Sequence, residues 1–199
     1  MKPHIIRALL VPGICLSVFA TGCGEFIRSD RAPVTLIIAA LEAARGSAPD
    51  AFEGNLTSDV TTQDVIFNDV GRVSMRLILK DPGQPGVTNA PSGINQVTVT
   101  RYRVVYRRAD GRNVAGVDVP QPFDGGVTFT VPPEGVVQAG FELVRHVAKL
   151  EPPLATLRTN GTIITTIADV TFYGHDQAGN AVSTTGSIQV AFGNFADEE

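Results

Sequence analysis

The sequence contains no tryptophan, only two cysteines and three histidines in 199 residues, and 7% of its residues are aromatic. Cys15 lies in an N-terminal leader, so Cys23 would be the only cysteine of the processed chain, which excludes an internal disulfide. The histidines do not form a pair at i, i+4, and no C-x-x-C motif is present, so no zinc motif is visible. His146 and His175 are predicted to have structural roles.

Motifs of catalysis are missing as well. The sequence has no G-x-S-x-G nucleophile elbow and no phosphate-binding glycine motif. We therefore predict a protein without catalytic activity, cofactor or metal. A calcium site remains an alternative, because Asp110, Asn113, Asp118 and Asp124 lie in neighbouring loops, although they lack the D-x-D-x-D-G spacing.

The first 22 residues have the pattern of a signal peptide. Lys2 and Arg7 form a short positive region, and the apolar run from Ala8 to Ala20 is too short to span a membrane. The residues Ala20-Thr21-Gly22-Cys23 that follow resemble the lipobox of bacterial lipoproteins. An ordinary secretory leader, cleaved near Ala20, is the alternative.

The lipobox resemblance implies cleavage before Cys23 and acyl chains on that residue, so the membrane would be a partner through lipid. In bacterial lipoproteins, a residue other than Asp after the cysteine implies transfer to the outer membrane, if the cell has one. In this sequence that residue is Gly24. Residues 23–33 are then a tether, residues 34–195 the folded domain and residues 196–199 an acidic tail.

The charge of the processed chain restricts its partners. It carries 14 basic against 20 acidic side chains, a net charge of −6. This argues against nucleic acid as a partner and against strong attraction to anionic lipid. Membrane attachment would depend on the acyl chains, at about 0.8 kcal/mol per buried CH₂.

Alternating apolar residues predict a β-hairpin near the C-terminus. In residues 163–175 and 181–192 the apolar side chains share even positions, so both strands turn one face to a core. This parity requires a loop of odd length. The loop of Gln177, Ala178 and Gly179 fits, with Asp176 opening a type I turn and Gly179 closing a G1 bulge at positive φ.

Further strands are predicted at 56–62, 71–80, 96–108 and 126–131. The inward positions change parity near Thr100 and Arg101, which indicates a β-bulge. Two segments are ambiguous between strand and helix, residues 34–45 and 136–150. In the first we favour a strand at Val34 to Ala39, with a helix capped by Gly46 as the alternative, and in the second we also favour strand. About seven strands with regular turns predict an all-β fold, an antiparallel β-sandwich.

Two short stretches carry a family resemblance. YRVVYRRADG, Tyr102 to Gly111, resembles a strand and turn of fibronectin type III domains. YGHDQAGN, Tyr173 to Asn180, resembles the D-x-A-G-N turn of bacterial immunoglobulin-like domains. The cysteine pair and tryptophan of true immunoglobulin domains are absent. The resemblance implies an immunoglobulin-like sandwich with an adhesive, spacer or assembly role.

One surface is a candidate for a partner. The strand 163–175 is apolar on both faces, and a face of this kind needs a cover. Its outward residues would neighbour arginines of the strand 96–108. The predicted patch consists of Arg101, Arg103, Arg107, Ile163, Ile167 and Tyr173. Its cover is either a partner or the chain itself, through the segment starting at Val34 or the loop 46–55.

The leading hypothesis is therefore a lipid-anchored binding or assembly module of the cell envelope, with an envelope protein or glycan as its partner. The alternative is an envelope enzyme acting on polysaccharide, or its carbohydrate-binding accessory domain. An enzyme of that class needs two carboxylates in a cleft, roughly 5 to 9 Å apart.

The anchor is open to a direct test. Cys23→Ala is expected to abolish acylation and recovery with membranes, because it removes the acylated thiol. Metabolic labelling with a fatty acid and membrane fractionation measure both. A wild-type protein that is exported, processed and freely soluble without acyl chains would contradict the prediction.

Overall fold

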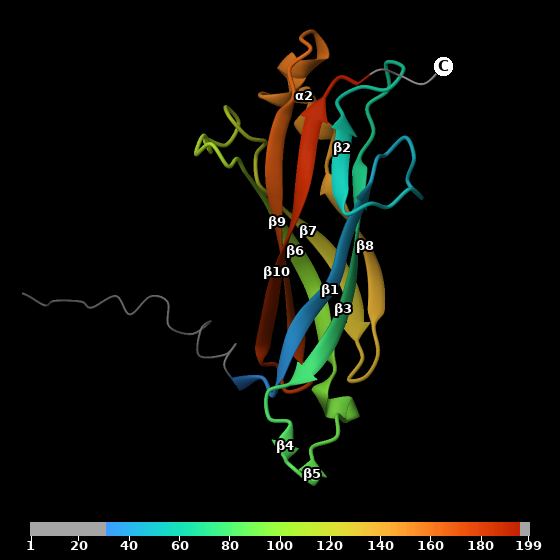
Figure 1. Ribbon diagram of the computed structural model, residues 1–199, viewed down its shortest axis with the longest axis vertical. Coiled ribbons are helices and arrows are strands. Elements are labelled where there is room, and N and C mark those ends of the chain that lie inside the picture. Colours follow the sequence, from blue (N-terminus) through green and yellow to red (C-terminus); the bar gives the residue numbers. More distant parts are fainter. Residues whose placement is uncertain (1–30, 196–199) are drawn as a thin grey trace, which may run out of the picture.

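The computed structural model describes residues 31–195, and strands dominate this part of the chain (Figure 1). The predicted leader, Cys23, the tether up to residue 30 and the acidic tail 196–199 lie outside the described residues. The strands are β1 Val34–Ala44, β2 Asn55–Asp59, β3 Asp69–Leu79, β4 Gly83–Gln84, β5 Val87–Thr88, β6 Val97–Arg107, β7 Phe123–Val131, β8 Val137–Val144, β9 Ile164–Asp176 and β10 Ala181–Gly193. The helices are η1 Gly93–Asn95, α2 His146–Leu150 and η2 Leu154–Arg158.

Eight of the strands form two sheets, which enclose a common core. One sheet has the order β1-β3-β8 and the other β2-β10-β9-β6-β7, while β4 and β5 form a separate hairpin. The fold is all-β, as predicted. β2 is the exception to antiparallel pairing, because it runs parallel to β10 along the edge of the larger sheet.

The core confirms the predicted inward positions of the C-terminal hairpin. Ala168, Val170, Phe172, Val190 and Phe192 have no exposed surface. The opposite sheet packs directly against this face. A Cβ at Gly186 would lie only 2.9 Å from Ile38 Cδ1 of β1, so a glycine lets the two sheets approach at this point.

The turn between β9 and β10 has the predicted geometry. The Asp176 carboxylate, which is 2% exposed, accepts hydrogen bonds from the backbone N–H of Ala178 at 2.9 Å and of Asn180 at 2.8 Å. The Gly179 N–H donates to the Asp176 carbonyl at 3.1 Å, and Gly179 has φ +80°. A three-residue loop therefore sets the register of the longest strand pair.

The predicted bulge in β6 is also present. The pairing register shifts between Val99 and Arg101 on both sides of the strand. The inward residues change from Val99 to Tyr102 across the shift, and both are buried. The Tyr102 ring packs on Phe141 and Phe172 in the core.

The two ambiguous segments resolve differently. Residues 34–44 form a strand that continues beyond the predicted end at Ala39, because Ala43 and Ala44 are buried where β1 pairs with β3. Residues 136–150 contain both alternatives, strand β8 followed by the short helix α2. The described chain has ten strands rather than about seven, and β4 and β5, with two residues each, are too short to leave an alternating pattern.

A buried ion pair joins the two sheets to α2. Lys149 Nζ lies 2.8 Å from Asp69 Oδ2, and the two side chains are 2% and 1% exposed. Ser58 Oγ donates to Asp69 Oδ2 at 2.6 Å, and the Gly46 N–H donates to Asp69 Oδ1 at 2.9 Å. The Asp69 carboxylate thus holds α2, β2 and the loop after β1 around the start of β3.

Removing the cation from this cluster should be costly. Lys149→Met is expected to destabilise the protein by about 3 to 5 kcal/mol, because the Asp69 carboxylate remains buried without a counter-charge. Urea unfolding measures the loss. The control is Arg76→Met on the exposed face of β3, expected within about 0.5 kcal/mol of wild type. Equal effects of the two substitutions would contradict a structural role for the ion pair.

Candidate binding surface

Five of the six residues of the predicted patch share the outer face of the larger sheet. β6 pairs with β9, so Arg101 lies opposite Tyr173 and Arg107 lies opposite Ile167, while Arg103 is exposed between the other two arginines. The neighbouring strands are those that the sequence predicted. Ile163 precedes β9 and is 55% exposed at the end of this face.

Two carboxylates outside the predicted patch form ion pairs with its three arginines. Asp124 of β7 bridges Arg101 at 3.4 Å and Arg103 at 2.7 Å, and Asp169 of β9 binds Arg107 at 2.6 Å. The Arg101 guanidinium also lies 3.7 Å from the centroid of the Tyr173 ring. The face therefore consists of internally paired charges rather than a free cationic cluster.

The pairing at Asp169 affects its titration. Partial burial raises the pKa of the Asp169 carboxyl, but hydrogen bonds from Arg107 and Ser187 lower it more, so the net pKa is below its usual range. Both acids occupy outward positions of strands adjacent to β6. Cross-strand register is the signal that would have found them, and it requires the sheet order.

Neither segment proposed as an own-chain cover lies over this face. The Val34 segment is β1 of the other sheet, paired with β3. The loop 46–55 packs near the start of β3, where Gly46 binds Asp69 and Phe52 lies under the Arg72 guanidinium. The structure thus does not bear out the alternative of an own-chain cover by these segments, and Ile167 is half-buried among its strand neighbours.

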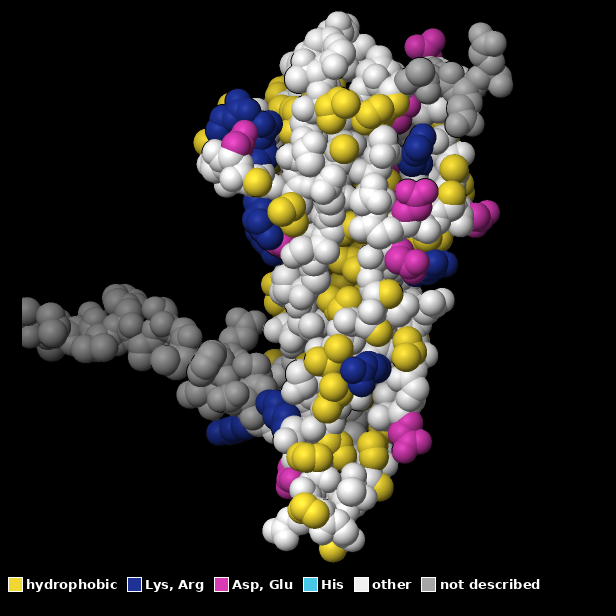
Figure 2. Space-filling model, viewed as in Figure 1, with side chains coloured by type: hydrophobic (Ala, Val, Ile, Leu, Met, Phe, Trp, Pro, Cys, Tyr) yellow, Lys and Arg dark blue, Asp and Glu magenta, His cyan; other side chains and the backbone are white. Residues whose placement is uncertain are grey.

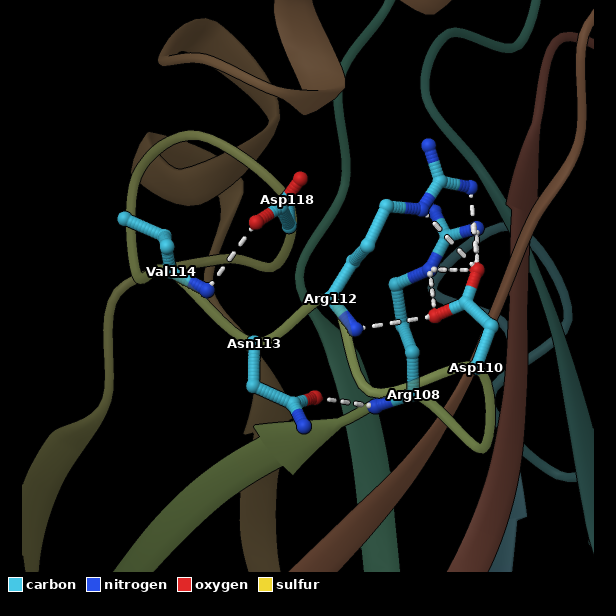
Figure 3. A network of polar contacts seen from close by, with 6 residues as sticks. All are labelled: Arg108, Asp110, Arg112, Asn113, Val114 and Asp118. Carbon is cyan, nitrogen blue, oxygen red and sulfur yellow. Dashed lines mark hydrogen bonds and ion pairs between the residues drawn. The ribbon is translucent and has the colours of Figure 1, made fainter.

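Beyond β6 the chain forms a projecting loop, residues 108–122, which we call the β6–β7 loop (Figure 1). Its first turn is organised around the Asp110 carboxylate (Figure 3). Asp110 Oδ2 accepts from Arg108 Nη2 at 2.6 Å and from Arg112 Nη2 at 2.9 Å, and Oδ1 accepts from the Arg112 backbone at 3.1 Å. Hydrogen bonding from Arg108, reinforced by Arg112, holds the pKa of Asp110 well below its usual range.

Side-chain to backbone hydrogen bonds also fix the β6–β7 loop. Asn113 Oδ1 accepts from the Arg108 N–H at 2.6 Å, and Asp118 Oδ2 accepts from the Val114 N–H at 3.1 Å (Figure 3). The Gly116 N–H donates to the Val119 carbonyl at 2.8 Å. The Val119 side chain, which is 2% exposed, packs in the hydrophobic core and so connects this turn to the body of the protein.

This ordered loop presents apolar side chains to solvent. Val114 is 60% and Val117 66% exposed, next to the arginine pair on Asp110. Figure 2 shows charged side chains of both signs beside hydrophobic ones on the projecting loop at the upper left. The sequence analysis identified here only the turn that ends the fibronectin-like stretch Tyr102 to Gly111, because residue types alone do not distinguish an ordered loop from a solvated one.

The four residues considered for calcium are engaged in other contacts. Asp110 and Asp124 bind arginines, and Asn113 and Asp118 accept backbone N–H groups. Within residues 31–195, no three His, Cys, Asp or Glu side chains come together as a metal site would require. The calcium alternative has no support from this geometry.

A polar hollow of about 320 Å³ lies between the segment after β1 and strand β2. Its charged lining residues are Arg45, Glu53 and Asp59. Asp59 is partly used by the protein itself, because its carboxylate accepts from the Thr61 and Phe195 N–H groups, each at 3.3 Å. Glu53 and Asp59 are the carboxylates in this hollow that an enzyme hypothesis would invoke.

Comparisons with known proteins identify no family for this chain. No protein-family model and no curated protein matches the chain. A solved structure, an X-ray structure described as a Northeast Structural Genomics Consortium target, aligns with 84% of this chain and 92% of its own at 10% sequence identity and a TM-score of 0.39. Likeness at that level establishes neither family nor function.

Asp110 is predicted to order the β6–β7 loop. In Asp110→Ala we expect faster amide hydrogen exchange across residues 108–122 with little change in the melting temperature, because the lost contacts are local and exposed. Glu134→Ala, in the exposed turn between β7 and β8, is the matched control. Unchanged exchange in the loop would contradict the prediction.

The same contact predicts a pH dependence. The folded pKa of Asp110 is depressed, so the order that it contributes is present above the usual aspartate pKa. That order is lost as the pH falls through the lower folded value. Loop protection should therefore persist at pH values where an ordinary aspartate is already protonated.

Proposed function

We propose that this protein is an exported, lipid-anchored binding or assembly module of the cell envelope, without catalysis of its own. The β6–β7 loop carries the proposal. It is a projection that exposes Val114 and Val117, and hydrogen bonds within the loop hold its shape. A preordered apolar tip lowers the entropic cost of binding a partner.

The strand order supports an immunoglobulin-like sandwich. β1, β3 and β8 are adjacent in the order of strands A, B and E, and β6, β9 and β10 in the order of C, F and G. β7 then occupies the place of C′ beside β6. The immunoglobulin-like fold is used for many functions, so the strand order supports a scaffold and leaves the partner to the loop.

The anchor rests on the sequence. A short apolar leader precedes Cys23 in a lipobox-like site, which suggests attachment by acyl chains at the outer membrane, if the cell has one. No helix of the described residues combines the length and hydropathy needed to cross a bilayer. We propose an envelope protein as the partner, because apolar side chains beside arginines are typical of protein interfaces.

The outer face of the larger sheet is the second part of the proposed surface. It starts from Arg107, immediately before the loop, and continues to Ile167 and Tyr173. Its hydroxyl and charged groups bind one another, as Thr171 and Thr185 do at 2.9 Å. A partner would exchange these contacts for its own, so this face contributes specificity more than affinity.

The hollow lined by Glu53 and Asp59 favours a second candidate, an activity on envelope polysaccharide or a carbohydrate-binding accessory role. Glu53→Gln with Asp59→Asn separates the candidates. These substitutions would abolish activity or glycan binding at the hollow, whereas a module that acts through its β6–β7 loop would keep its partner.

The partner hypothesis is tested at the two exposed valines of the β6–β7 loop. We expect Val114→Asp with Val117→Asp to remove partners captured by in vivo cross-linking, while the protein stays folded and anchored, because both side chains already face water. Val136→Asp is the matched control, since Val136 is 56% exposed in the turn between β7 and β8.

Two results would count against the proposal. One is an identical set of cross-linked proteins for wild type and the loop variant. The other is an equal loss of partners in Val136→Asp, which would point to a general effect of surface charge.

A further inference from the structure

The tether enters the fold at a defined end of the molecule. Val34, the first residue of β1, pairs with Leu79, the last of β3, and the Lys80 N–H donates to the Pro33 carbonyl at 2.9 Å. Ala32 is buried at 1% exposure. The chain therefore arrives beside the end of β3, at the end of the molecule opposite α2 (Figure 1).

The segment that leaves β3 at this point forms a projection, residues 81–96, which we call the β3–β6 tip. It contains the β4–β5 hairpin and η1 (Figure 1). The sequence from Pro82 to Thr100 has no charged side chain. Val87 is 75% and Ile94 64% exposed, and Figure 2 shows hydrophobic side chains at this lower end.

Local hydrogen bonds give the β3–β6 tip its shape. The Gly83 N–H donates to Asp81 Oδ1 at 2.9 Å, and Asn89 donates to the Pro82 carbonyl at 3.1 Å through its backbone. At η1, Ser92 and Asn95 form a capping box. Backbone geometry thus holds Val87 and Ile94 away from the core.

The tether limits the distance between this tip and the proposed lipid. From Cys23 to Arg31 the chain has eight residue steps, which span at most about 26 to 29 Å when fully extended. Acyl chains on Cys23 would therefore keep the β3–β6 tip near the bilayer. The β6–β7 loop lies at the other end of strand β6.

We propose that the β3–β6 tip rests on the bilayer surface, with Val87 and Ile94 inserted among the lipid headgroups. The inference rests on the proposed lipid anchor. Its own basis is an apolar-tipped projection, without charged side chains from Pro82 to Gln96, at the end where the tether enters. Two aliphatic side chains bind a membrane weakly by themselves, but the anchor makes the contact intramolecular, so a weak contact suffices.

The chain has no tryptophan, so one introduced residue reports on a single position. Acylated Val87→Trp is reconstituted into vesicles of phosphatidylethanolamine and phosphatidylglycerol containing a brominated phospholipid. We expect a blue-shifted emission that the bromine quenches. Acylated Val147→Trp, on α2 at the far end and 44% exposed, should be neither shifted nor quenched. Ile94→Trp is the second reporter of the tip.

A third protein separates the contact from the anchor. Val87→Trp in a Cys23→Ala chain, added to the same vesicles, should show no quenching, because the contact is then intermolecular. If the acylated protein is recovered with vesicles but both tip reporters emit like Val147→Trp, the tip proposal is overturned while the anchor stands.

Two other results would also overturn it. A blue shift that occurs in native envelopes and not in lipid vesicles would assign the tip to a protein partner. Failure of the wild-type protein to acquire acyl chains would remove the anchor, and the tip proposal would fall with it.

Discussion

The ion pair between Lys149 and Asp69 is the constraint on which the arrangement of the sheets depends. Two buried charges are costly unless each finds its partner, and this carboxylate also takes the hydroxyl of Ser58 and the N–H of Gly46. These donors come from α2, β2 and the loop after β1. This set of donors adds to the hydrophobic pattern in specifying the arrangement. The cluster thus selects how the edge strand β2 and the helix α2 meet the start of β3.

Local patterns predicted much of the strand architecture. Parity in the C-terminal hairpin indicated the inward residues and the length of the loop, because period-two alternation and turn chemistry act within one strand pair. The bulge near Arg101 was predicted for the same reason. The change from β8 to α2 was not resolved, since Phe141 and Val144 also fit a helical spacing, and the burial of Lys149 depends on a distant partner. Lys149 also illustrates that a buried charge leaves no signal when its counter-ion is 80 residues away in sequence.

The surface was less predictable than the core. Alternation placed Arg101, Arg103 and Arg107 outward correctly, but Asp124 and Asp169, which neutralise them, come from two other strands. The β6–β7 loop shows the same limit. Its sequence reads as an ordinary turn, and its order arises from how Asp110, Asn113 and Asp118 combine with backbone groups. That the patch of six residues receives a partner stays a prediction.

The antiparallel ladder between β1 and β3 has a mechanical consequence. The proposed tether would enter at Val34, at one end of the ladder, and β6 carries the chain to the β6–β7 loop at the other end. Tension between a fixed tether and a partner held at that loop would run along the strand axes. The hydrogen bonds from Val34 to Ala44 would then be loaded together in shear instead of being peeled apart one at a time. Such a geometry resists force well, independently of how stable the protein is in solution.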